Sequence, residues 1–185
     1  NPEPKFTYGI GNTFSWKGFD LTVFLTGSYG NDILNYTNRF MTISGANHNL
    51  MKDVGYATVG KIDPNGPDDF RNYHVTGGDP LSPRIFTNSA KNMNWRVSDR
   101  YIEDGSYLRI QNISLGYTLP KKWLQKTPLQ NVKVYANLQN VYTWTKYKGY
   151  DPEVGNLWGN ALYNGIDYGR YPSPRIYTFG LNVSF

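Results

Sequence analysis

The feature that most constrains the fold of this chain is a residue-by-residue alternation of large apolar and small polar side chains. Successive side chains of a β-strand point to opposite faces. The alternation over residues 177–185 therefore predicts a strand with one apolar and one polar face. The apolar face carries Tyr177, Phe179, Leu181, Val183 and Phe185. The polar face carries Thr178, Gly180, Asn182 and Ser184.

The same alternation recurs and predicts five strands. They cover residues 6–16, 20–30, 107–119, 132–145 and 175–185. A strand of about 10 residues rises roughly 33 Å and, tilted near 45°, crosses about 23 Å, which matches the apolar band of an outer-membrane barrel. We therefore predict an all-β fold of antiparallel strands in a transmembrane β-barrel. Because a closed barrel needs about eight strands or more, further strands must lie elsewhere on the polypeptide or on a partner.

The connections between these strands alternate between short and long. Short turns join the first strand to the second and the third strand to the fourth. Residues 31–100 and 146–174 form long connections between the other strands. Outer-membrane barrels alternate short periplasmic turns with long external loops in this way. We therefore expect 31–100 and 146–174 to be extracellular loops. A change of phase near Asn112 predicts a bulge, and Phe24 stands out of phase in its strand.

Composition narrows the functional classes. Charged residues make up 18% of the chain, below the roughly 25% of typical soluble domains, while aromatic residues reach 16%. The formal charge of +5 is spread along the chain, so nucleic acid is not an expected partner. There is no cysteine, and no phosphate loop, dinucleotide fingerprint or activated Ser/His/Asp set is visible. We expect no catalytic residue, no cofactor and no metal site, and read the oxygen-rich residues 63–69 as a turn.

Several long blocks, in the same order, resemble a known family. They are residues 1–9, 98–120 (SDRYIEDGSYLRIQNISLGYTLP), 137–147 (NLQNVYTWTKY), 149–154 (GYDPEV) and 174–185 (PRIYTFGLNVSF). Together they resemble the C-terminal signature of SusC/RagA-type TonB-dependent transporters of Bacteroidetes. Nearly the whole chain is covered, except for the large connection between about Asn31 and Val97.

The resemblance implies the last five strands of a 22-stranded barrel in the outer membrane of a Gram-negative bacterium. It also implies that a plug domain and a TonB box precede this chain. The implied partners are the rest of the barrel, TonB, outer-membrane lipid and a SusD-like lipoprotein that covers the external loops. The implied function is import of glycans or peptides, not catalysis.

The final strand also resembles the outer-membrane assembly signal that the Bam machinery reads. The residues that carry this resemblance are Tyr177, Phe179, Leu181, Val183 and Phe185. A regular amphipathic strand can pair with another sheet edge, which gives the signal a physical basis. The alternative is that Phe185 only anchors the strand in the lower aromatic girdle.

Aromatic residues gather in the second long connection. Aromatic faces stack on sugar rings, so we predict substrate contacts there. The candidate residues are Tyr147, Tyr150, Trp158, Tyr163 and Tyr168, together with Trp95 in the first long connection. Two other interpretations remain open for these residues, namely packing within the loop and contact with the lid lipoprotein.

Two other classes of protein remain open. One is a soluble β-sandwich that binds carbohydrate, and the other is a barrel that acts as an adhesin without transport. The apolar faces distinguish a sandwich from a barrel, because a sandwich buries them in a shared core and a barrel turns them to lipid. The residues to inspect are Leu21, Val23, Leu115, Val134 and Leu181.

Overall fold

A computed structural model describes residues 1–42, 50–52, 54–83 and 96–185. The chain divides into two compact units. The first combines residues 1–34 with residues 102–185, and the second comprises residues 35–101. Each unit is described by itself below.

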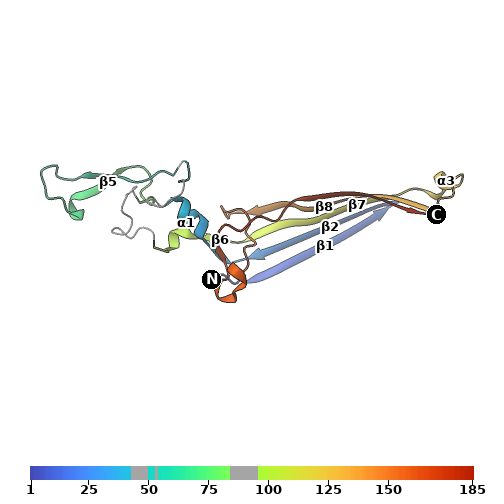
Figure 1. Ribbon diagram of the computed structural model, residues 1–185, viewed down its shortest axis with the longest axis horizontal. Coiled ribbons are helices and arrows are strands. Elements are labelled where there is room, and N and C mark those ends of the chain that lie inside the picture. Colours follow the sequence, from blue (N-terminus) through green and yellow to red (C-terminus); the bar gives the residue numbers. More distant parts are fainter. Residues whose placement is uncertain (43–49, 53, 84–95) are drawn as a thin grey trace. The chain divides into compact units, whose positions relative to one another are not determined.

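A five-stranded sheet dominates the first unit (Figure 1). Its strands are β1 (Phe6–Trp16), β2 (Phe19–Tyr29), β7 (Tyr107–Thr118), β8 (Asn131–Thr145) and β10 (Ile176–Ser184). They lie in the order β1-β2-β7-β8-β10, and every neighbouring pair is antiparallel. The predicted all-β, antiparallel fold class is confirmed.

The short connections lie at one end of this sheet. β1 and β2 are joined by Lys17 and Gly18, whose φ angles of 46° and 90° are both positive, as in the type I′ turns that suit twisted hairpins. A Cβ on Gly18 would stand 2.7 Å from the Thr118 carbonyl oxygen, so the close approach also favours glycine. The helical turn α3 (Lys121–Leu124) follows β7 at the same end.

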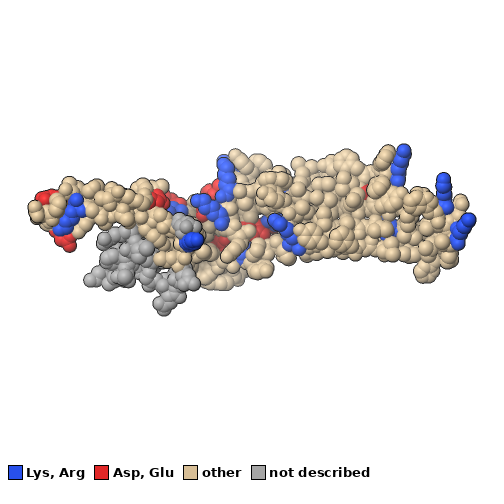
Figure 2. Space-filling model, turned by 90° about the horizontal axis from the view of Figure 1, so that it is seen from above, with Lys and Arg blue, Asp and Glu red and all other residues tan. Residues whose placement is uncertain are grey.

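The strand registers align apolar residues into continuous rows on one face of the sheet. One such row crosses four strands through Val23, Ile113, Leu138 and Tyr177. Most large apolar residues of this face remain exposed, among them Phe14, Leu115, Val134 and Phe179. Over the middle of the sheet, the side seen in Figure 2 carries few charged side chains. In the described part of the chain, no second sheet covers the apolar face.

The opposite face is polar and carries an ion pair that spans three strands. Lys133 Nζ on β8 lies 2.9 Å from the Asp20 carboxylate on β2. The lysine crosses β7 above Gly116, where a Cβ would stand 2.5 Å from Lys133 Cε. A side chain at this position of the intervening strand would therefore displace the lysine from its present path.

Two irregularities expected from the sequence, the bulge near Asn112 and the out-of-phase Phe24, lie opposite each other on neighbouring strands. The pairing of β7 shifts between Ile110 and Asn112, and that of β2 shifts between Phe24 and Leu25, as a bulge near Asn112 requires. Phe24 lies on the polar face, where its ring covers the glycines of β1; its Cζ lies 3.4 Å from the position of a Cβ on Gly9. The out-of-phase phenylalanine thus fills space that the glycines leave.

The long connections contain secondary structure of their own. β3 (Asp32–Asn35) lies between β6 (Ile102–Asp104) and β9 (Ile166–Asp167) in a small sheet. The single-turn helices η3 (Leu157–Gly159) and η4 (Ala161–Tyr163) precede β9. Ile33, Tyr147 and Val154 form a small buried core beside these elements. Residues 146–174 therefore contain short regular elements and contribute to a small buried core, although most of their side chains are exposed.

The second unit contains α1 (Tyr36–Thr42) and an antiparallel pair, β4 (Thr58–Lys61) and β5 (Tyr73–Gly77). The single-turn helices η1 (Phe70–Asn72) and η2 (Asp99–Tyr101) complete its elements. Residues 63–69 form a turn in which Asp63 Oδ1 accepts the Asn65 backbone N–H at 2.9 Å. The Asn72 amide closes this turn by donating to the carbonyls of Asp63 and Pro67.

None of the helices in the described ranges is both long enough and apolar enough to cross a bilayer. Among the same residues, no three His, Cys, Asp or Glu side chains are grouped as metal ligands would be.

Candidate functional site

A buried arginine lies on the polar face of β7, near the end of the sheet that carries the long connections. The Arg109 side chain is only 3% exposed. Its Nε donates to Thr143 Oγ1 at 2.9 Å, its Nη2 to Asp151 Oδ1 at 2.5 Å and its Nη1 to Glu153 Oε2 at 2.8 Å. A buried charge is tolerated only when it is paired in this way. Arg109 therefore fastens residues 151–153 to the sheet.

The carboxylate of Asp151 is fully engaged. Besides Arg109, its Oδ1 accepts the Glu153 backbone N–H at 3.0 Å, and its Oδ2 accepts the Ser173 backbone N–H at 3.1 Å. Burial raises the pKa of Asp151, but the two backbone donors and Arg109 outweigh burial, so the pKa lies below the ordinary value. Asp151 is thus ionised near neutral pH and joins both ends of the second long connection to β7.

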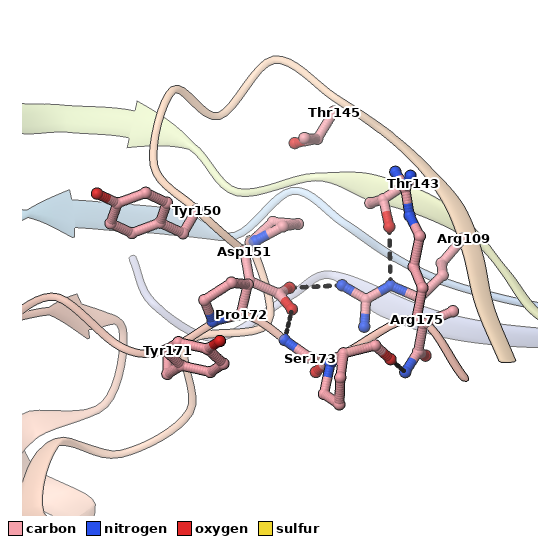
Figure 3. A pocket seen from close by; sticks show the side chains of 12 residues that line it. Arg109, Thr143, Thr145, Tyr150, Asp151, Tyr171, Pro172, Ser173 and Arg175 are labelled. Carbon is pink, nitrogen blue, oxygen red and sulfur yellow. Dashed lines mark hydrogen bonds and ion pairs between the residues drawn. The ribbon is translucent and has the colours of Figure 1, made fainter. Parts of the chain in front are cut away.

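A cavity of about 520 Å³ lies beside this cluster (Figure 3). We call it the loop-end pocket. Tyr150 and Tyr171 line it with rings that are 70% and 86% exposed. In Figure 3 these two rings lie on one side, while the Arg175 side chain extends on the other side beside Thr143. The remaining lining includes Arg109, Asn140, Thr145, Asp151, Pro152, Pro172, Ser173 and Pro174.

The loop-end pocket opens on the polar side of the sheet. Arg109 and Thr143 face each other in the register of β7 and β8, on the face that also carries Ser114 and Asn137. The pocket is therefore separated from the apolar face by the sheet itself. Of the predicted contact residues, it includes Tyr150.

Tyr147 is placed differently, in the small core. It is 6% exposed, and its hydroxyl donates to Asp167 Oδ2 at 2.5 Å. Burial raises the pKa of Tyr147, and the neighbouring Asp167 raises it further. Asp167 Oδ1 accepts the backbone N–H groups of Gly169 and Arg170. For Tyr147 the structure thus favours packing within the loop over contact with a substrate.

Replacing Tyr147 with phenylalanine tests this role. The change removes the hydroxyl and leaves Asp167 without one buried donor, at a cost of about 1–3 kcal/mol. We expect faster hydrogen exchange of the amides in residues 146–169. Tyr150→Phe, at an exposed position, is the matched control and should leave exchange unaltered. Unchanged exchange in the Tyr147 variant would contradict a packing role.

Trp158, Tyr163 and Tyr168 form a second aromatic group. The Trp158 ring lies 6.1 Å from each of the other two ring centroids, at interplanar angles of 88° and 51°. Trp158 is 78% exposed and has a φ of 53°, a backbone conformation that is strained for a bulky residue. The backbone at Trp158 is therefore strained, and the aromatic group to which this residue belongs remains exposed. Trp95, the sixth predicted contact residue, lies outside the described residues.

The predicted assembly strand is an edge of the sheet. β10 pairs with β8 and with no other strand in the described residues. Its apolar set is exposed and consists of Tyr177, Phe179, Leu181, Val183 and Phe185. An unpaired edge of this kind can pair with a further strand, and the role as an assembly signal stays a prediction.

Sequence reasoning did not single out Arg109, Asp151 or Arg175. A possible signal was the isolated arginine within an otherwise uncharged strand, because a charge on a strand of this kind needs a partner. The acidic pair in the block at residues 149–154 supplies that partner.

Comparisons with known proteins give the same assignment as the resemblance. The chain is 35% identical over its whole length to TonB-dependent receptor P3 of Formosa agariphila, of which it covers 17%. It is 30% identical to TonB-dependent receptor P26 of the same organism, again covering 17%. It is 38% identical over 91 residues to TonB-dependent receptor SusC of Bacteroides thetaiotaomicron, covering 48% of this chain and 8% of SusC.

Solved structures agree. The RagAB peptide importer in its closed-closed state matches the whole chain with a TM-score of 0.73 and 25% identity, and the match covers 18% of the importer chain. No model of a known protein family matches. The chain spans about a sixth of the length of its curated relatives. Its resemblance to SusC/RagA-type TonB-dependent receptors is thereby confirmed over the whole chain, which corresponds to part of the barrel of such a receptor.

Proposed function

We propose that this chain forms wall and outer loops of a TonB-dependent transporter that imports nutrients across the outer membrane of a Gram-negative, Bacteroidetes-like bacterium. Glycans or peptides are the proposed cargo. The names of the similar proteins, which include TonB-dependent receptors and a peptide importer, support this class of function.

The observation that carries the proposal is the uncovered apolar face of the five-stranded sheet. Rows such as Val23, Ile113, Leu138 and Tyr177 run across it. Lipid is a natural covering for a strand face of this kind, because an outer-membrane barrel alternates apolar residues outward with polar residues inward. The polar face, with the Asp20–Lys133 ion pair, then faces the lumen.

The sheet also requires further strands in a bilayer. β1 and β10 are both edges, and unpaired backbone groups in lipid cost several kcal/mol each. The rest of the barrel would pair with these edges and enclose a plug. Coupling to TonB, a SusD-like lipoprotein over residues 31–100 and 146–174, and Bam-assisted assembly through β10 complete the proposed set of partners.

A soluble carbohydrate-binding β-sandwich is less well supported. Such a fold needs a second sheet packed on the first. Of the five residues that distinguish the two folds, Leu115, Val134 and Leu181 are exposed in the described structure, while Leu21 and Val23 are half-buried. The adhesin alternative differs from the transporter in that it does not transport, and a full-length protein without a plug domain would favour it.

Expression of the full-length receptor in its native host tests the proposal. We expect the protein in the outer-membrane fraction, with extraction only by detergent. Growth on the cognate nutrient should be lost when either the receptor or TonB is deleted. Recovery of the intact receptor in the aqueous fraction would contradict the barrel, and nutrient uptake that persists when the receptor is deleted would favour the adhesin over transport.

A further inference from the structure

We propose that the loop-end pocket binds an acidic saccharide, with Arg175 as the residue that recognises a sugar carboxylate. This inference rests on the proposed transport function, because it assigns a substrate class to a pocket on the proposed lumen face. The inference is based on those side-chain groups of the pocket that are not bound to other protein groups and can therefore contact a ligand.

The first step concerns charge. The lining contains two arginines and one aspartate. Arg109 and Asp151 neutralise each other, and Glu153, which is outside the lining, binds Arg109 as well. Arg175 is exposed, and the described residues offer it neither an ion pair nor a hydrogen bond. Its planar guanidinium can hold a carboxylate through two parallel hydrogen bonds.

The second step concerns shape. The exposed rings of Tyr150 and Tyr171 lie across the pocket from Arg175 (Figure 3). Aromatic faces provide flat apolar area for the C–H faces of a pyranose, and the phenolic hydroxyls can bond sugar hydroxyls. The volume of about 520 Å³ lies within the range of ligand pockets, about 300–1,000 Å³.

The third step separates a saccharide from a peptide. A peptide brings backbone N–H groups that need acceptors, and the one carboxylate that lines this pocket already accepts protein donors. Both Asp151 oxygens accept protein donors, Thr143 Oγ1 accepts from Arg109, and the Pro174 carbonyl accepts from Asn140 Nδ2. Asn140 Oδ1 has no hydrogen-bond partner, but it is buried. The exposed groups that a ligand can reach include the Arg175 guanidinium and the hydroxyls of Tyr150 and Tyr171. These suit a ligand that carries carboxylates and hydroxyls.

Calorimetry on the detergent-purified full-length receptor provides the test. The probes are tetragalacturonate, its fully methyl-esterified form and a tetraglutamate peptide. We expect the wild type to bind tetragalacturonate at least roughly tenfold more tightly than the ester, since a hydrogen-bonded charge is lost in the ester. Arg175→Gln should abolish this preference. Arg175→Lys should restore part of it, because lysine keeps the charge but not the planar fork.

Two further variants control for general effects. Lys122→Gln on α3 removes the same charge at the opposite end of the sheet and should bind like the wild type. The double variant Tyr150→Ala, Tyr171→Ala should weaken the acid and the ester alike, because stacking does not depend on the carboxylate. Native folding of each variant is checked by its heat-modifiable migration on gels.

The outcomes separate this inference from the function on which it rests. Equal affinity for acid and ester, or no binding of tetragalacturonate, would overturn the acidic-sugar assignment. Tetraglutamate that binds as tightly, with the same dependence on Arg175, would also overturn it and assign the pocket to acidic peptides. Fractionation and TonB dependence of the receptor do not involve these probes, so failure of transport itself would be seen separately.

Discussion

Replacing Arg109 with methionine is expected to release the second long connection from the sheet. The change leaves the Asp151 carboxylate, which is 7% exposed, buried without its cation. Removal of one partner from a buried ion pair typically costs about 3–5 kcal/mol. The expected result is a large loss of hydrogen-exchange protection in residues 146–174 of the full-length receptor, while the strands β1 and β2 keep theirs.

A matched control and a second substitution test whether the unpaired Asp151 carboxylate causes this loss of protection. Arg71→Met removes an arginine whose side chain is 78% exposed in its pair with Asp69, and exposed pairs are worth about 0–1 kcal/mol. That variant should behave like the wild type. Adding Asp151→Asn to Arg109→Met should recover part of the protection, because the neutral amide removes the unpaired charge and keeps an acceptor for Ser173. Protection that survives Arg109→Met would refute the fastening role of the arginine.

The regular part of the fold could be predicted from the sequence because the strands have a strict two-residue period. One apolar face fixes the register of each strand, since a slip by one residue would turn every side chain to the wrong side. The same logic located the bulge, where Gln111 interrupts the pairing between Ile110 and Asn112. Phe24 stood out of phase because it covers glycines on the polar face, a contact between strands that one strand's pattern does not contain.

The structure within the long connections could not be predicted in the same way. β6 and β9 contain three and two residues, which are too few for a period of two to be recognised. The Arg109 cluster joins residues that are 42 and 44 positions apart, and no spacing rule in the sequence connects them. Their proximity follows from the antiparallel pairing of β7 with β8 and the return of the chain over its end.

Composition alone does not tell which of the candidate contact residues are buried and which are exposed. Tyr147 and Tyr150 lie three positions apart, yet one is 6% and the other 70% exposed. The difference arises because the Tyr147 hydroxyl finds a buried acceptor in Asp167, whereas Tyr150 lines the loop-end pocket. Composition indicated where aromatic residues gather, and tertiary contacts decided which of them are buried and which line a pocket.

The second large effect is expected on the sheet itself, from one substitution placed on each of its two faces. Ile113 and Ser114 are consecutive in β7, near its middle, and therefore point to opposite faces. Ile113 lies between Val23 and Leu138 on the apolar face, and Ser114 lies between Thr22 and Asn137 on the polar face. An arginine on the lipid face near the bilayer midplane costs about 2–4 kcal/mol, whereas a position facing the lumen tolerates charge.

We therefore expect Ile113→Arg to lower the amount of folded receptor in the outer membrane strongly and Ser114→Arg to leave it close to the wild-type level. Quantitative blotting of the outer-membrane fraction, with heat-modifiable migration as the measure of folding, gives the comparison. Equal loss in both variants would mean that the sheet does not separate lipid from lumen. A greater loss for Ser114→Arg would mean that the faces are reversed, so that the Arg109 cluster and the loop-end pocket could not lie on the lumen side.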